Sequence, residues 1–150
     1  MYTTKEQKII DYLKRYKGES GLYIIRIKKN KRGTLKKICS SIDLPYKSDV
    51  AYVGKGAKLK TTDLYVRSRQ EMGWSNFSGA TFVKKIGRYL KLDVLDKKNK
   101  MLQLSTRNFI LETFDIECKI LPKGKNLLDW ETEHIKQLHA CLNNKKNNMQ

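Results

Sequence analysis

The chain is predicted to be one small domain of mixed α and β structure, and three observations support this class. Its 150 residues fit a single domain by the usual relation of length to core size. Apolar residues recur at helical spacing near both ends of the chain, in residues 2–17 and 127–142. Short runs rich in β-branched and aromatic residues lie between them, in residues 21–28, 50–53 and 108–121.

The first two elements are a helix followed by a strand. The helix is expected over residues 2–17, and Thr3 or Thr4 can cap its start. Gly18 is expected to end it. The strand over residues 21–28 follows, because its sequence Leu-Tyr-Ile-Ile-Arg-Ile is dense in strand-forming residues. The apolar face of the helix is formed by Ile9, Ile10, Leu13 and Tyr16.

A lysine-rich run over residues 28–37 is expected to form a loop or a hairpin tip before the second strand. Such a run can be a solvated surface or a loop that faces DNA, and the sequence favours neither. The second strand is expected over residues 50–53, ended by Gly54 and Gly56.

The second half of the chain is expected to be mainly helical. A helix capped by Asp63 should run to Met72 and stop at Gly73. Another is expected over residues 81–92, with Phe82, Ile86, Tyr89 and Leu90 as its inner face. A strand over 108–121 ends at Pro122, the last helix covers 127–142, and the basic tail 145–150 is expected to fray.

The charge of the chain predicts a polyanionic partner. Lys and Arg number 32 against 15 acidic residues, a formal net charge of +17. Such an excess suits nucleic acid first and an anionic membrane second. No apolar stretch approaches the length of a spanning helix and no signal peptide opens the chain, so we expect DNA, not a membrane, as the partner.

The cysteines predict a cytoplasmic protein. Cys39, Cys118 and Cys141 are odd in number and far apart in the sequence. They match neither a disulfide framework nor paired zinc ligands. We therefore expect three reduced thiols, as is usual in the cytoplasm.

One carboxylate occupies an unusual place in the last predicted helix. Glu131 lies in the middle of its apolar stripe, whereas Asp129 and Glu133 point toward water. A buried carboxylate is costly unless it is paired, hydrogen-bonded or bound to a metal. A buried arginine, backbone donors or an ion can each satisfy it, and helix geometry does not choose among them. The other members of the stripe are Leu127, Ile135, Leu138 and Leu142.

Several motifs resemble those of the GIY-YIG nucleases, metal-dependent enzymes that cut phosphodiester bonds. Gly21-Leu22-Tyr23 opens the first strand, and Tyr52-Val53-Gly54-Lys55 follows in the second. Glu131 and, twelve positions later, Asn143 match the glutamate and asparagine of the family. The resemblance covers about residues 20–145, and it implies a central three-stranded, mostly antiparallel sheet with helices on both sides.

The resemblance also implies roles for these residues. Glu131 would hold a single Mg²⁺ or Mn²⁺ and Asn143 would help to order the site. Tyr23 and Tyr52 would line it, and Tyr52 or Lys55 would help to deprotonate the attacking water. A free phenol has a pKa near 10, so a tyrosine base needs a nearby cation or metal-bound water. The phenol, the lysine and a metal-bound hydroxide all stay open as the base.

An arginine is also implied, to bind the scissile phosphate. The family spacing Asp-Leu-x-x-Arg matches Asp63 to Arg67, and Arg69 is the substitute if the register differs. The sequence departs from the family in a longer segment at 24–51, a longer spacer at 56–62, and the absence of a histidine one turn after the arginine, where Glu71 stands. These departures affect the exact roles of the residues.

We therefore expect a divalent-metal-dependent endonuclease that hydrolyses DNA. DNA contacts are expected from Lys28, Lys29, Lys31, Arg32, Lys58 and Lys60. The alternative is a basic nucleic-acid-binding module without chemistry, which lysine-rich loops and exposed aromatics such as Trp74 and Phe77 would serve equally well. A carboxylate on the apolar stripe does not serve that module, because it repels phosphate unless a cation intervenes. A homodimer is compatible with the sequence, and no protein partner is evident.

Overall fold

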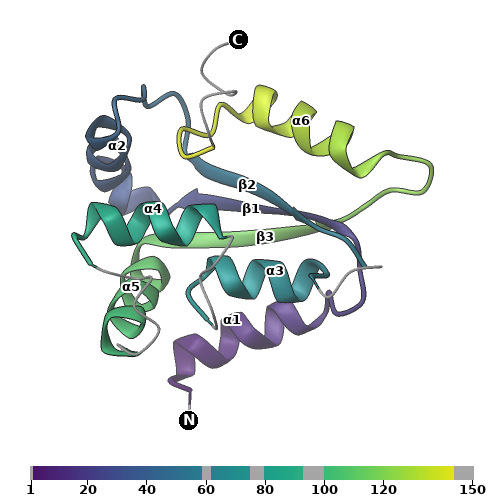
Figure 1. Cartoon of the computed structure of the whole chain (residues 1–150), viewed down its shortest axis with the longest axis horizontal. Helices are drawn as coiled ribbons and strands as arrows, with labels where there is room; N and C mark the ends of the chain where they lie inside the picture. Colours follow the sequence, from purple (N-terminus) through teal and green to yellow (C-terminus); the bar gives the residue numbers. More distant parts are fainter. Residues whose placement is uncertain (1, 59–61, 75–79, 93–99, 144–150) are drawn as a thin grey trace.

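The computed structural model describes residues 2–58, 62–74, 80–92 and 100–143. Within them, the chain forms an antiparallel three-stranded sheet surrounded by helices (Figure 1). The strands are β1, Gly21–Ile27, β2, Val50–Gly56, and β3, Phe114–Ile120. The helices are α1, Thr4–Lys14, α2, Arg32–Ser41, α3, Leu64–Glu71, α4, Thr81–Tyr89, α5, Lys100–Thr113, α6, Leu127–Leu138, and the short 3-10 helix η1, Lys29–Lys31. The predicted fold class is confirmed at this level.

The strand order is β2-β1-β3, so β2 lies at an edge of the sheet. Gly21 pairs with Gly56 on one side and with Ile120 on the other. The pairing with β2 shifts between Ile25 and Arg26, where the ladder contains an irregularity. Gly21 cannot be replaced without movement, because a Cβ there would overlap the backbone oxygen of Lys119.

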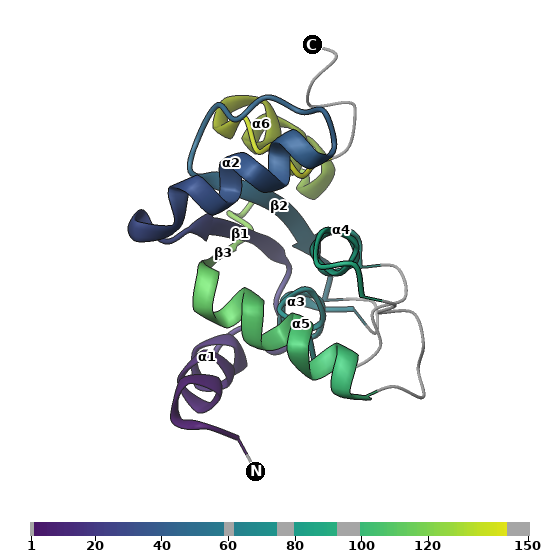
Figure 2. The same cartoon turned by 90° about the vertical axis from the view of Figure 1, so that its left-hand side faces the viewer.

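The two faces of the sheet bury different helices. Successive side chains of a strand point to opposite faces, so Tyr23 and Ile25 enter one core and Leu22 and Ile24 the other. The larger core receives buried side chains from α1 to α5, and the smaller one is covered by α6 through Trp130. Figure 2 shows α6 on one side of the sheet with α1, α3 and α5 on the other. Helices on both sides were expected.

Two helix starts were predicted correctly, each for the expected reason. Thr3 caps α1, where its hydroxyl accepts from the N–H of Glu6 and the Glu6 carboxylate accepts from the N–H of Thr3. Asp63 caps α3 and accepts from the N–H of Val66 at 2.8 Å. The chain leaves α1 through Gly18, whose φ of +75° favours glycine.

The lysine-rich run is helical, so the prediction of a loop at residues 28–37 was wrong. It forms η1 and the first part of α2. The apolar residues of α2, Leu35, Ile38 and Cys39, recur at i, i+3 and i+4 and are buried. This spacing was present in the sequence, but the surrounding lysines obscured it.

The strand predicted over 108–121 begins only at Phe114, because its first half is the end of α5. Thr106, Ile110 and Thr113 are buried at helical spacing there. The last helix also ends earlier than predicted, at Leu138. His139 adopts a left-handed conformation with φ of 51°, which stops the helix and turns the chain back toward β2.

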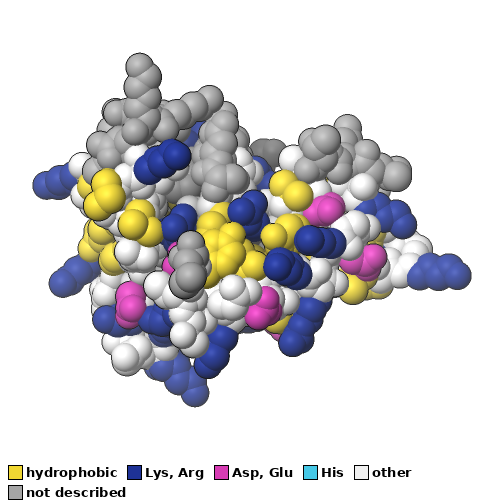
Figure 3. Space-filling view, turned by 90° about the horizontal axis from the view of Figure 1, so that it is seen from below, with side chains coloured by type: hydrophobic (Ala, Val, Ile, Leu, Met, Phe, Trp, Pro, Cys, Tyr) yellow, Lys and Arg dark blue, Asp and Glu magenta, His cyan; other side chains and the backbone are white. Residues whose placement is uncertain are grey.

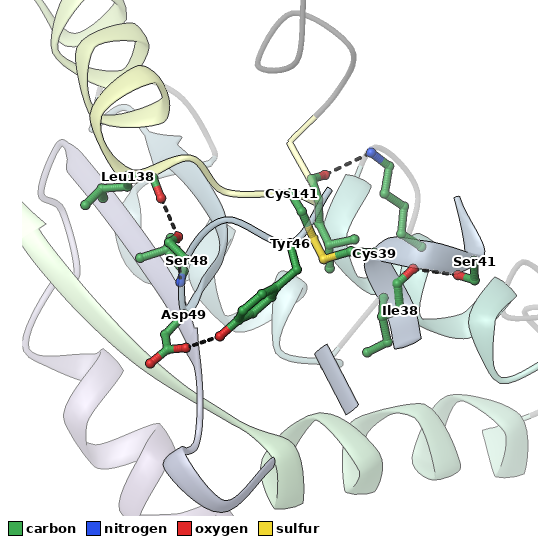
Figure 4. Close-up of a disulfide and its surroundings, with 11 residues drawn as sticks. Ile38, Cys39, Ser41, Tyr46, Ser48, Asp49, Leu138 and Cys141 are labelled. Carbon is green, nitrogen blue, oxygen red and sulfur yellow. Dashed lines mark hydrogen bonds between the residues drawn. A yellow bond between two sulfur atoms is a disulfide. The ribbon is translucent and has the colours of Figure 1, made fainter. Parts of the chain in front are cut away.

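Two cysteines are joined, so the expectation of three reduced thiols was wrong. Cys39 of α2 and Cys141 after α6 form a disulfide with their Cα atoms 6.0 Å apart (Figure 4). They lie 102 residues apart in sequence, and only the tertiary fold brings them together. Cys118 is a buried free thiol. The inference of a cytoplasmic location loses the support that it took from the thiols.

The helices of the structure can be compared with the length and polarity that a membrane span requires. Within the described residues, every helix is too short or too polar to traverse a lipid bilayer.

Candidate active site

A cavity of about 420 Å³ opens beside the edge strand β2. It is lined by side chains from β1, β2, α3 and α6, which are distant in the sequence. Five residues that the sequence singled out are among those that line it: Tyr23, Tyr52, Lys55, Arg67 and Glu131. The rest of the wall is formed by Gly54, Gly56, Ala57 and Thr62.

Glu131 is the acidic group of this cavity. Its side chain is 14% exposed, whereas Asp129 and Glu133 are classed as exposed. One carboxylate oxygen accepts a hydrogen bond from the Lys55 ammonium at 3.0 Å. The stripe on α6 therefore presents Glu131 to the cavity, as the helix spacing predicted, and its partner in the described part of the chain is a lysine of the neighbouring strand.

Lys55 reaches α6 because of the alternation along β2. Val53 packs in the core beneath α6, and Lys55, two residues on, points to the same face of the sheet. Its side chain is 41% exposed. An ion pair with one half-exposed partner contributes little to stability, of order 0–1 kcal/mol, so the ammonium can leave the carboxylate for a phosphate without a large cost.

Tyr23 is held in place by a glycine and a buried carboxylate. A Cβ at Gly54 would overlap the phenol of Tyr23, so only glycine lets the ring cross β2. The Tyr23 hydroxyl donates to Glu71 Oε2 at 2.9 Å. Tyr23 is 1% exposed, so packing and this hydrogen bond fix its phenol at the wall of the cavity.

Glu71 is a member of the site that sequence reasoning did not select. It is fully buried, and its other oxygen accepts from the N–H of Val83 at 3.2 Å. The start of α4 has no side-chain cap of its own, so Glu71 satisfies a free N–H there and lies at the positive end of the helix. Burial raises the pKa of Glu71, against the Val83 N–H, Arg67 and Tyr23, which lower it.

The signal that could have identified Glu71 was its position. It stands four residues after Arg67 and therefore shares its helix face. An acid next to a predicted phosphate-binding arginine suggests a charge that orients that arginine. The sequence analysis noted Glu71 only as the residue that replaces a histidine.

Tyr52 lies beside Tyr23 with ring centroids 6.3 Å apart, and it packs on Phe82 at 5.8 Å. Burial raises the pKa of both phenols, and the nearby Glu71 raises them further. A hydrogen bond with Thr81 and the charge of Arg67 lower the pKa of Tyr52 only in part. Without a bound cation the two phenols are neutral at pH 7 and can donate or accept hydrogen bonds, but they are poor bases.

Arg67 lines the cavity from α3, whereas its substitute Arg69 does not. The Arg67 guanidinium donates to Gln70 Oε1 at 2.8 Å. The positive charge of Arg67 acts to lower the pKa of Glu71 and of both tyrosines. Of the two candidate arginines, the geometry favours Arg67 for a phosphate-binding role.

Asn143 lies outside the cavity but supports its wall. Its side-chain oxygen accepts from the N–H of Val53 at 2.9 Å and its nitrogen donates to the C=O of Val53 at 2.8 Å. It is 6% exposed. The amide therefore acts as a neighbouring strand would for β2, a positioning role and not a chemical one.

The predicted DNA-binding residues do not lie together. Lys28 donates to the C=O of Leu111, and Arg32 pairs with Asp49. Both follow the Ile27 end of β1, about 13 Å along the strand from Tyr23, the residue of β1 that lines the cavity. Lys29 and Lys31 lie beside them in η1.

Two further predicted contacts differ in their position. Lys58 is exposed and lies close to the cavity, because its N–H donates to Ser20 and Ala57 lines the wall. Lys60 lies outside the described residues. Figure 3 shows Lys and Arg side chains spread over the face seen from below Figure 1, so charge by itself does not locate a nucleic-acid surface.

Trp74, one of the two aromatic residues expected to be exposed in a nucleic-acid-binding module, is buried. Trp74 is 3% exposed and packs beneath the Arg107 guanidinium at 5.2 Å. Phe77 lies outside the described residues.

A divalent metal would have one protein carboxylate here. Among the described residues, no group of three or more His, Cys, Asp or Glu side chains could hold a metal ion. Mg²⁺ commonly keeps several waters and takes one or two carboxylates together with phosphate oxygens. Glu131 fits such an ion as its single carboxylate ligand, in competition with Lys55.

Compared with models of known protein families, with curated proteins and with solved structures, the chain gives no match. The resemblance to the GIY-YIG nucleases therefore stays a prediction that depends on the motifs and on the geometry of the cavity.

Proposed function

We propose that the chain is a divalent-metal-dependent endonuclease of the GIY-YIG type that hydrolyses DNA phosphodiester bonds. The observation that carries the proposal is the convergence on one cavity of Tyr23, Tyr52, Lys55, Arg67 and Glu131. These residues come from four elements. A structural role in the core does not require two cations, a carboxylate and two phenols to share a solvent-connected hollow.

The charged residues have separate roles, some toward the phosphate and one toward the metal. Glu131 would hold Mg²⁺ or Mn²⁺, which supplies Lewis-acid stabilisation of the charge on the phosphate and the leaving oxygen. Arg67 binds a non-bridging phosphate oxygen, as planar guanidinium groups do. Lys55 leaves Glu131 to offset the negative charge that grows in the transition state.

The tyrosines are assigned to positioning. Tyr23 donates to Glu71, so its proton is already engaged and its oxygen can still accept from water. Tyr52 lies next to it, and its raised pKa disfavours the phenolate. Both phenols therefore orient the attacking water. The Lys55 ammonium has no lone pair to accept the proton of that water, so its role is to offset charge. A bound Mg²⁺ or Mn²⁺ would supply the chemistry that makes the water acidic.

Plasmid nicking with Mg²⁺ or Mn²⁺ tests the proposal. Glu131→Gln should lower the rate by about three orders of magnitude or more, since loss of one essential electrostatic contact commonly costs that much. Glu133→Gln is the matched control, because it removes the same charge from an exposed position of α6, and it should cut normally.

Each other result has a definite meaning. Unchanged cutting by Glu131→Gln would remove this residue from the mechanism. No cutting by the unaltered protein with any divalent metal would favour the non-catalytic binding module.

A further inference from the structure

A second cavity, of about 560 Å³, lies between α2, the chain that follows it, and the C-terminal end of α4. Its apolar wall includes Ile42, Leu44 and Tyr89. Ile42 is one of the large apolar residues that stay exposed, at 39%. A hollow of this size is in the range of small-molecule sites and has room for one planar ring the size of a nucleobase.

The charged residues that line this cavity are all cationic. Lys85, Arg88 and Lys91 line it, and no acidic residue does. Lys85 donates to the C=O of Leu142 at 2.8 Å, which fixes it in the wall. Arg88 and Lys91 are exposed, and within the described part of the chain neither has an ion-pair partner. An apolar wall under two such cations suits a ligand with a flat apolar part and a negative charge.

Helix α4 joins this cavity to the candidate active site. Its first residue, Thr81, hydrogen-bonds Tyr52, and Tyr89 at its other end lines the second cavity. Eight residues of helix span about 12 Å. A nucleic-acid strand advances about 3.4 Å per nucleotide along a stacked helix, so this length of α4 corresponds to about three or four nucleotides.

We propose that this second cavity binds an unpaired nucleotide of the substrate, about three or four nucleotides from the phosphate that is cut. The base packs on Ile42, Leu44 and Tyr89, as bases do on apolar and aromatic side chains. Its phosphates contact Arg88 and Lys91. A base inside a duplex cannot enter a concave pocket without unpairing, so the site selects substrates with a single-stranded end or an extruded base.

The positive charge of this cavity favours a nucleotide over the C-terminal tail of the chain as its occupant. The sequence after Asn143 contains Lys145 and Lys146 and no acidic residue, so it has the same sign as the rim. The inference that the nucleotide belongs to a substrate depends on the proposed nuclease function, but binding to the cavity does not require cutting.

The test is equilibrium binding of fluorescein-labelled dT5 and of a blunt 15-base-pair duplex, measured by anisotropy in EDTA so that no cutting occurs. We expect Arg88→Gln/Lys91→Gln to weaken dT5 binding about tenfold or more, and Ile42→Asp about fivefold. The matched control is Lys8→Gln/Lys14→Gln, which removes the same charge from exposed positions of α1. This control should change the affinity for either ligand by no more than about twofold.

Several results would overturn the inference. They are no binding of dT5 by the unaltered protein, an equal loss of dT5 and duplex binding in the Arg88/Lys91 variant, and an effect no larger than that of the α1 control. Competition by a pentaglutamate peptide as strong as by unlabelled dT5 would also overturn it, because it would indicate a general anion site.

The result is separable from that of the proposed function. If dT5 binds through the second cavity but no metal supports cutting, the nucleotide site stands and the nuclease proposal fails. If cutting requires Glu131 but the Arg88/Lys91 variant cuts blunt and overhanging duplexes in the unaltered ratio, the nuclease proposal stands and the nucleotide site fails.

Discussion

Replacement of Gly54 by alanine tests whether the site depends on the close approach of Tyr23 to β2. The added methyl would overlap the phenol of Tyr23. The ring cannot withdraw easily, because it is 1% exposed and its hydroxyl is bound to buried Glu71 at 2.9 Å. Overpacking of a dense core commonly costs about 1–3 kcal/mol. We expect the upper end, about 3 kcal/mol, and a large loss of cutting.

The assay is urea unfolding followed by fluorescence. With a slope of about 2 kcal/mol per molar urea, the expected loss lowers the midpoint by about 1.5 M. Gly33→Ala is the matched control, because nothing lies within 4 Å of a Cβ there. Since Gly33 is in α2, its replacement should leave stability unchanged or raise it by up to about 1 kcal/mol.

A double-mutant cycle with Tyr23→Leu separates the clash from other effects of the methyl group. Leucine lacks the outer ring atoms that the methyl would meet. The cost of Gly54→Ala should therefore fall by about 2 kcal/mol in that background. A coupling below about 0.5 kcal/mol would refute the reasoning, because the cost would then arise elsewhere than at the Tyr23 ring.

Three further predictions concern the supports of the site. Because the folded-state pKa of Glu71 is raised above its ordinary value of 4.5, the contribution of this residue to stability should be largest below that value and be lost as pH rises through the folded pKa, by at most about 1.4 kcal/mol per pH unit; Glu71→Gln should lack that part of the pH dependence in thermal melts. Cys39→Ser/Cys141→Ser should lower the free energy of unfolding by about 2–5 kcal/mol, and added dithiothreitol should destabilise the unaltered protein but not this variant. Asn143→Ala should cost about 2–4 kcal/mol, because it leaves the buried N–H and C=O of Val53 without partners, and a loss under about 1 kcal/mol in urea unfolding would contradict that account.

The elements predicted correctly are those in which a local signal agrees with the tertiary structure. Helix α1 has a capping box and a regular apolar face, and Asp63 is a strong cap. Helix α2 was missed because it begins inside the lysine-rich run 28–37, which was read as a loop, while its buried apolar residues start only at Leu35. The start of β3 was missed because α5 passes directly into it at Thr113 and Phe114, without a glycine or proline to mark the change.

Some features of the candidate site could likewise be predicted from the sequence, and others could not. Glu131 could be predicted because helix spacing alone places it on the apolar stripe of α6, which is half-buried in the structure. Its pairing with Lys55 could not, because the contact joins residues 76 positions apart and depends on the packing of α6 over β2. The Cys39–Cys141 disulfide and the contact of Glu71 with α4 are also products of tertiary packing, which no local pattern contains.

The outer edge of β2 shows why one end of this strand is suited to a ligand. An edge strand exposes backbone groups on alternate residues. The outward groups of Ala51 and Val53 are bound by the segment after α6, through the N–H of Leu142 at 2.9 Å and the amide of Asn143. The disulfide at Cys141 ties this segment to α2. By the same alternation, the next outward position is Lys55, which lines the cavity. The segment Cys141–Asn143 thus covers the edge of β2 up to the residue before the cavity, so loosening this segment should disturb the geometry at Lys55 even though none of its three residues lines the cavity.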